Sequence, residues 1–161
     1  MEILICGLRE VPEVRELYPN ITKVLSIIEF EPPVELFEGL EHRTILVGDH
    51  EWEQDATSPT ASTVEQIIEF ADSCADDDVV LVHCWAGVSR STAAAMIIHY
   101  RKHSDLAAAE ACVAQRRIAA PNRLIAELAD RYFEHKDNEL LKIAQRLNDE
   151  RGFGELTGWK L

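Results

Sequence analysis

The sequence predicts an α/β domain in which a short, largely parallel central sheet is flanked by helices. Two observations lead to this fold class. Short apolar runs of strand length alternate with helical patterns in the first half of the chain, whereas the second half is mainly helical. In addition, residues 79–82 form a continuous run of Val and Leu, which is typical of a strand buried on both faces of a parallel sheet.

Four strands are expected, each marked by a short apolar run. Gly7 ends the first run and Gly48 ends the third, because glycine favours turns over strand interiors. Residues 29–42 are rich in proline and glutamate, and residues 48–59 are polar, so both stretches are expected to be loops. The four predicted strands are residues 3–6, 23–28, 44–47 and 79–82.

Helices are expected where apolar residues recur at helical spacing or where alanine is abundant. The helix that starts near Ser62 has apolar residues at positions i, i+3, i+4 and i+7, counted from Val64. Ser62 and Glu65 also fit a capping box. The remaining predicted helices are residues 12–17, 91–103, 105–117, 122–135 and 137–150.

The length of 161 residues is that of one ordinary domain, so residues 1–161 are expected to form a single domain. The glycine-containing tail at 151–161 shows no pattern that assigns it to an element. The chain is 47% hydrophobic and 28% charged, which excludes wholesale disorder.

The net charge restricts the partners that the chain can bind. It is −13, from 16 Lys and Arg against 29 Asp and Glu. Because the electric field of such a negatively charged protein repels polyanions, we expect neither nucleic acid nor a membrane as a partner. An anionic substrate therefore requires a local positive site.

The pattern of the four cysteines bears on the cellular compartment in which the protein is expected. Cys6, Cys74, Cys84 and Cys112 are scattered without a CxxC pair, so neither a zinc site nor a disulfide framework is expected. The N-terminus resembles no signal peptide, and no apolar stretch approaches the length of a membrane span. These features predict a cytoplasmic protein.

The most informative segment is residues 82–92, where a buried strand ends at Cys84 and a helix begins near Arg90. The connecting loop contains Gly87, and such a loop directs backbone N–H groups inward to form an anion nest. The helix N-terminus adds partial positive charge, and Arg90 can bind two oxygens of one phosphate. This positive environment favours the thiolate of Cys84, which is a nucleophile aimed at phosphorus.

Two neighbours of this loop have expected supporting roles. Ser91 can hydrogen-bond the thiolate and ease its departure from a phosphocysteine. His83 is expected to orient the loop through hydrogen bonds. The phosphate itself is expected to bind to the loop residues Trp85, Ala86, Gly87, Val88, Ser89 and Arg90. Sequence alone leaves open whether Trp85 walls the pocket or packs under a neighbouring helix.

This segment resembles a known family. His83-Cys84, five further residues and then Arg90-Ser91 match the HCx5R(S/T) signature of cysteine-dependent protein tyrosine phosphatases. Residues 86–91 are most similar to the compact dual-specificity branch, and the overall layout is similar to its small bacterial members. Residues 117–122 resemble the R-x-i-x-PN segment of these enzymes, which implies that Asn122 braces the phosphate loop.

The resemblance also implies a general acid, an aspartic acid on a separate loop that protonates the leaving oxygen. Two candidates lie in the predicted loop at 48–59. Asp49 directly follows a predicted strand and matches the position used in the similar bacterial members, so we favour it. Asp55 begins a D-x-x-x-P pattern that is similar to other dual-specificity branches, and it remains the alternative.

The implied activity is hydrolysis of phosphate monoesters through a phosphocysteine. The implied substrate is phosphotyrosine, or phosphotyrosine plus phosphoserine and phosphothreonine, in protein or peptide, and phosphate or another oxyanion is expected to bind in the site. No cofactor or metal is implied. Two alternatives remain: a catalytically weak phosphate-binding module and a phosphatase that acts on a non-protein substrate. The uncharged Trp85, Ala86, Val88 and Ser89 weigh against a highly charged substrate.

Overall fold

The structure is a computed structural model and describes residues 1–151. Its four strands form one sheet in the order β1-β4-β2-β3, and all neighbouring strands are parallel. The predicted α/β class with a parallel central sheet is therefore confirmed. The tail predicted at 151–161 lies outside the described residues, apart from Arg151. The strands are β1 (Glu2–Gly7), β2 (Lys23–Ile28), β3 (Glu41–Leu46) and β4 (Val79–Cys84).

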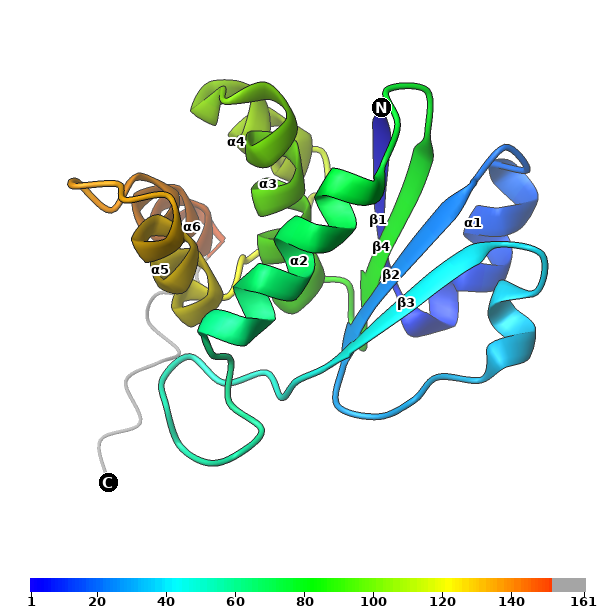
Figure 1. The fold of residues 1–161 in the computed structure, drawn as a ribbon, viewed down its shortest axis with the longest axis horizontal. Helices are drawn as coiled ribbons and strands as arrows, with labels where there is room; N and C mark the ends of the chain where they lie inside the picture. The colour runs from blue at the N-terminus through cyan, green and yellow to red at the C-terminus, as the bar shows by residue number, and fades with distance from the viewer. Residues whose placement is uncertain (152–161) are drawn as a thin grey trace.

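Helices lie on both sides of the sheet, but unequally. The short helix α1 (Val11–Leu17) and the 3-10 helix η2 (Val34–Phe37) lie on one side, and five longer helices lie on the other (Figure 1). Within residues 1–151, no helix combines the length and the apolar character needed to span a membrane. The five longer helices are α2 (Ala61–Ser73), α3 (Arg90–His103), α4 (Leu106–Ala114), α5 (Arg123–Tyr132) and α6 (Glu139–Glu150).

Strand β4 lies inside the sheet, and its alternating side chains enter two separate hydrophobic cores. Val80, Val82 and Cys84 belong to the larger core beneath α2–α6, whereas Val79 and Leu81 belong to the smaller core beneath α1. Burial on both faces explains why this strand reads as a continuous apolar run rather than as an alternating one.

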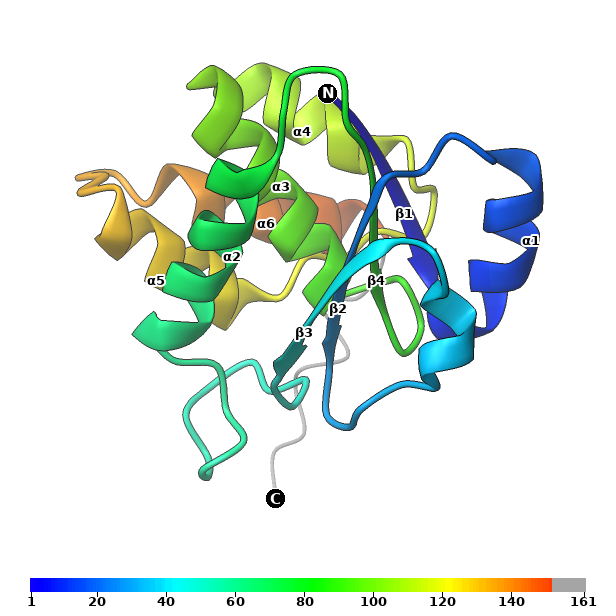
Figure 2. The same ribbon diagram turned by 45° about the vertical axis from the view of Figure 1, so that its right-hand side comes forward.

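Because all four strands are parallel, their carboxyl ends meet at one end of the sheet. The loops that follow β2, β3 and β4 gather there, at the bottom of the view in Figure 2. Gly7 at the end of β1 pairs with Cys84 at the end of β4, and Ser26 of β2 pairs with His83. Ligands of open α/β sheets bind at this end, so the fold places the Cys84 loop in the expected location.

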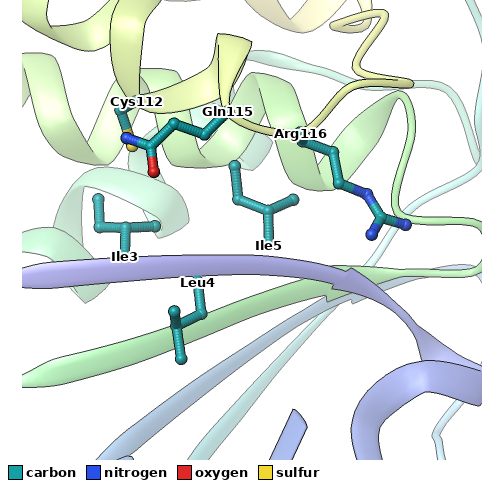
Figure 3. Close-up of a pocket in the computed structure, with 6 residues that line it drawn as sticks. All are labelled: Ile3, Leu4, Ile5, Cys112, Gln115 and Arg116. Atoms are coloured by element: carbon teal, nitrogen blue, oxygen red, sulfur yellow. The ribbon is translucent and has the colours of Figure 1, made fainter. Parts of the chain in front are cut away.

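Strand β1 forms one edge of the sheet and leaves a hollow of about 230 Å³ between itself and α4. Figure 3 shows Ile3 and Ile5 pointing from β1 toward Cys112 and Gln115, whereas Leu4 points to the opposite face. None of the predicted site residues lines this hollow.

Several predicted boundaries differ from the structure; for example, α4 ends at Ala114 rather than at residue 117, and α5 ends at Tyr132 rather than at residue 135. Strand β3 begins at Glu41 rather than at residue 44, because an edge strand tolerates polar residues such as the exposed Glu41 and the partly exposed Arg43. The capping box of α2 is formed by Thr60 and Thr63, not by Ser62 and Glu65. The predicted box was therefore wrong, because Thr60 has extended backbone and the helix begins one residue after it.

Candidate active site

The loop from Cys84 to Arg90, here called the phosphate loop, connects β4 to α3 and lies against the end of β1. Gly87 has a positive φ of +69°, and a Cβ atom on it would lie 2.4 Å from backbone atoms of Cys6 and Gly7. Only glycine fits this position, because a larger residue would be strained and would collide with β1. The N–H of Leu8 donates to the carbonyl of Trp85 at 3.1 Å, so β1 also holds the start of the loop.

The thiol of Cys84 lies at the bottom of this loop. Cys84 is 1% exposed, and its Sγ accepts a hydrogen bond from the N–H of Gly87 at 3.3 Å. The hydroxyl of Ser91 lies 3.2 Å from the same sulfur. Ser91 is in the first turn of α3, so the sulfur lies near the positive end of that helix. These contacts suit a sulfur that carries negative charge.

Arg90 is almost completely buried, yet its Nε has no hydrogen-bond partner among residues 1–151. Nη1 donates to the carbonyl of Val47 at 2.8 Å and also pairs with the carboxylate of Glu29. Nε is buried and has no hydrogen-bond partner among the described residues, although the Asp49 carboxylate lies 3.6 Å away. A buried N–H without a partner is costly, so this N–H is suited to binding an oxyanion.

Glu29 was not singled out from the sequence. Burial acts to raise the pKa of Glu29, but the hydrogen bond and charge of Arg90 outweigh this effect and lower it. Glu29 therefore stays ionised and holds Arg90 in place. A carboxylate directly after strand β2, at the ligand-binding end of a parallel sheet, is the signal that could have pointed to it.

The structure separates the two candidate acids. Asp49 is directed to the phosphate loop, where its Oδ1 accepts hydrogen bonds from Ser89 Oγ at 2.6 Å and from Asn122 Nδ2 at 3.0 Å. Asp55 is directed elsewhere and accepts from the hydroxyl and the N–H of Thr57 at 2.7 and 2.8 Å. These hydrogen bonds lower the pKa of Asp55. Only Asp49 contacts the loop that carries Cys84.

His83 lies directly beneath the loop in a buried chain of hydrogen bonds. Its Nε2 lies 2.5 Å from the hydroxyl of Ser26, which in turn lies 2.7 Å from Nε2 of His42. Phe37 stacks on the His83 ring with a centroid separation of 5.3 Å. Burial lowers the pKa of His83 to about 4, so the ring is neutral at physiological pH. These contacts hold the ring in place beneath the loop, as expected for a residue that orients it.

Asn122 joins the phosphate loop to the loop that bears Asp49. Its backbone N–H donates to the carbonyl of Ser89 at 3.2 Å, and its side chain donates to Asp49 and to the carbonyl of His50, both at 3.0 Å. Its Oδ1 also caps α5 by accepting from the N–H of Ile125. One buried side chain thus holds three elements together.

A second brace, which the sequence did not indicate, lies behind the loop. Arg116 donates from Nε to the carbonyl of Gly87 at 3.1 Å and forms a two-bonded ion pair with Glu10, at 3.2 and 2.6 Å. Glu10 also accepts from the N–H of Gly7 at 2.5 Å. The Glu10–Arg116 pair therefore connects the end of β1 to the phosphate loop.

The other three cysteines differ from Cys84 in their surroundings. Burial is the main reason why the pKa of Cys6 rises to about 12 and that of Cys112 to about 11, and it also raises the pKa of Cys74. Cys6 belongs to the core on the opposite face of the sheet from Cys84. These thiols therefore stay protonated at neutral pH.

Comparison with solved structures identifies the fold as that of dual-specificity and protein tyrosine phosphatases. DUSP15 is similar over 94% of this chain and 93% of its own, with 24% identity and a TM-score of 0.66. The Yvh1 phosphatase domain from Chaetomium thermophilum is similar over 82% of this chain and 90% of its own, with 26% identity and a TM-score of 0.57.

A third similar structure is PTPMT1 in complex with PI(5)P. The likeness covers 92% of this chain and 94% of that one, with 17% identity and a TM-score of 0.60. No protein-family model and no curated protein sequence matches the chain. At these identities the likeness establishes the fold, and the residues of the site carry the argument for function.

Proposed function

We propose that the chain hydrolyses phosphate monoesters through a phosphocysteine intermediate on Cys84. The observation that carries this proposal is the guanidinium of Arg90, which is fixed through Nη1 while its buried Nε has no hydrogen-bond partner among the described residues. This donor lies in the same short loop as a buried sulfur that already accepts an N–H hydrogen bond. A phosphate bound to Arg90 and the loop would lie above the sulfur, in line for attack.

The reaction then proceeds in two steps. The Cys84 thiolate attacks phosphorus, the bond from phosphorus to the ester oxygen breaks, and the departing oxygen takes a proton from an aspartic acid. Water next attacks the phosphocysteine and gives its proton to the same aspartate, which releases inorganic phosphate and restores the thiolate. Ser91 donates a hydrogen bond to the sulfur as it leaves phosphorus.

Asp49 is the aspartic acid that we assign to this role. It is hydrogen-bonded to Ser89 of the phosphate loop, and 40% of its side chain is exposed, so it can reach a leaving group at the rim. Asp55 is a poor candidate because its carboxylate accepts hydrogen bonds from Thr57 within its own loop and, among residues 1–151, none from the phosphate loop.

We assign the substrate as phosphotyrosine, or phosphotyrosine together with phosphoserine and phosphothreonine, in protein. The loop offers Arg90 for one phosphate, and carboxylates of Glu29 and Asp49 surround that guanidinium. These carboxylates and the net charge of −13 repel further phosphate groups, which favours a singly phosphorylated protein over a polyphosphorylated lipid or nucleic acid.

The experiment that tests the proposal is hydrolysis of para-nitrophenyl phosphate by the purified chain as a function of pH, with chelator and reductant present. Turnover that survives the chelator and is lost on alkylation of Cys84 supports it. Absence of turnover together with tight binding of tungstate would instead identify a phosphate-binding module. Turnover of phosphorylated lipids alone, with no hydrolysis of phosphopeptides, would reassign the substrate.

A further inference from the structure

Beside the phosphate loop lies a small group of exposed side chains that the reaction does not use. Trp85 is 48% exposed and Phe30 is 39% exposed. Their rings meet edge to face, with centroids 5.6 Å apart. Phe30 comes from the loop after β2 and Trp85 from the loop after β4, so the pair spans two of the loops at the carboxyl end of the sheet. Exposed aromatic pairs at such a rim are typical of recognition surfaces.

Arg9 completes this group from the side of β1. Its guanidinium carbon lies 5.9 Å from the centroid of the Trp85 ring, a cation–π distance. A hollow of about 290 Å³ opens at this point, next to the phosphate loop. Its lining residues are Gly7, Arg9, Glu10, Trp85 and Ala86. The hollow is large enough to receive one amino-acid side chain.

The charge in this hollow is positive, although the chain as a whole is strongly acidic. Arg9 is exposed and forms no ion pair with any carboxylate among residues 1–151. The one carboxylate in the lining, Glu10, is already bound by Arg116 and by the N–H of Gly7. The charge of Arg9 is therefore not compensated within the hollow.

The carboxylates of Glu29 and Asp49 contact Arg90 rather than Arg9. The site therefore offers a cation over an aromatic ring at Arg9 and carboxylates around Arg90. Such a difference in charge can orient an extended peptide, because charge complementarity mainly determines specificity and register.

We propose that Arg9, Trp85 and Phe30 form a recognition surface for the residue next to the phosphorylated one in a peptide substrate. The occupant is a phosphotyrosine peptide with an aspartate or glutamate beside the phosphotyrosine. Trp85 and Phe30 provide apolar contact to the peptide, and Arg9 binds the acidic side chain in the hollow. This inference rests on the proposed function, which accounts for binding of the phosphate group. It adds a preference for an acidic residue next to the phosphotyrosine.

The test measures peptide binding rather than turnover, using the full chain with Cys84→Ser. Fluorescent phosphotyrosine peptides carry Asp, Asn or Lys beside the phosphotyrosine, on each side in turn, and anisotropy gives their Kd values. We expect the Asp peptide to bind about three- to fivefold more tightly than the Asn peptide at low salt, as for one exposed ion pair. The preference should shrink as salt screens the charges.

Substitution of Arg9 in this background decides the assignment. Arg9→Gln should remove the preference for Asp, and Arg9→Glu should transfer it to the Lys peptide. Arg131→Gln, which removes an exposed arginine at the far end of α5, is the matched control and should leave the preference unchanged. An Asp preference that persists in Arg9→Gln, or no preference in the starting chain, would overturn the proposal.

Two further outcomes separate this inference from the proposed function. Hydrolysis of para-nitrophenyl phosphate by the native chain, a substrate without a flanking residue, reports only on the proposed function. Peptide selectivity through Arg9 without such turnover would support the recognition surface and contradict catalysis. A soluble phosphoinositide headgroup that binds through Arg9 more tightly than every peptide would contradict the peptide assignment.

Discussion

The loop after β4 and the loop after β3 face each other across the candidate site, yet they are held in very different ways. In the first, the Cys84 residue is 1% exposed and the Arg90 side chain is 3% exposed. In the second, the side chains of Asp49 and Asp55 are 40% and 57% exposed. The proposed nucleophile and the proposed anion-binding group are thus buried, whereas both candidates for the proton donor stand at the rim.

This difference fits the roles that we propose for the two loops. A phosphate cradle needs fixed backbone donors, so β1, Asn122 and Arg116 hold it from three directions. A general acid must reach a leaving group that varies with the substrate and must exchange its proton with water. A few hydrogen bonds at an exposed rim meet that need better than burial does.

The largest expected effect concerns the buried loop. We expect Cys84→Ser to lower kcat for para-nitrophenyl phosphate at least about a thousandfold, because the hydroxyl is a much weaker nucleophile than the thiolate. Tungstate binding, measured by calorimetry, should persist because Arg90 and the loop N–H groups remain. Substantial turnover by this variant would exclude the phosphocysteine mechanism.

Burial of His83 predicts a pH-dependent stability. Its pKa is lowered to about 4, whereas an unfolded histidine titrates near about 6.5. Between these values the unfolded chain binds the additional proton, so the free energy of unfolding falls as the pH drops from about 6.5 to 4, by about 3 kcal/mol in total. Urea titrations across this range measure the loss. His83→Gln should reduce it and the exposed control His103→Gln should not; equal losses in both variants would contradict the assignment.

The two aspartates of the β3–α2 loop should differ sharply in their effect on activity. Asp49→Asn should lower kcat about a hundredfold and flatten the pH profile, because the leaving group loses its proton donor. Asp55→Asn should leave kcat close to the native value, since Asp55 contacts Thr57 rather than the phosphate loop. The reverse order of effects would transfer the role to Asp55.

The smallest effect concerns the brace behind the phosphate loop. Arg116→Met removes the donor to the carbonyl of Gly87 and the partner of Glu10. We expect kcat/KM to fall about tenfold and tungstate binding to weaken in parallel, because the cradle is less well positioned. Arg101→Met breaks a comparable two-bonded ion pair with Asp72 on the surface and serves as the control. Equal effects of the two variants would show that Arg116 acts only on stability.

Much of the buried loop was predictable because its parts are neighbours in the chain. Cys84, Gly87, Arg90 and Ser91 lie within eight consecutive residues, so spacing alone describes a strand end, a tight loop and a helix start. The choice of the general acid at the rim of the site was less predictable. Asp49 and Asp55 lie in the same polar loop, and only their contacts in the folded chain distinguish them.

The residues that support the phosphate loop were the hardest to predict from the sequence. Glu29 is 61 positions from Arg90, Ser26 is 57 from His83, and Glu10 is 106 from Arg116. Each pair is brought together by the order of the strands or by the return of α4 to the edge of β1. Resemblance to a family had indicated Asn122, but its simultaneous contact with Asp49 and the phosphate loop is a property of the fold.

The sequence by itself determined the parallel α/β architecture and the loop between β4 and α3, because periodicity, glycine placement and local spacing are written along the chain. The tertiary structure decided which aspartate faces the loop, which carboxylate holds Arg90 and which arginine lies beside Trp85 without an ion pair among residues 1–151. Those choices depend on strands that are neighbours in space but not in sequence. Hydrogen bonds and ion pairs act over a few ångströms, so they are specified only once the sheet is assembled.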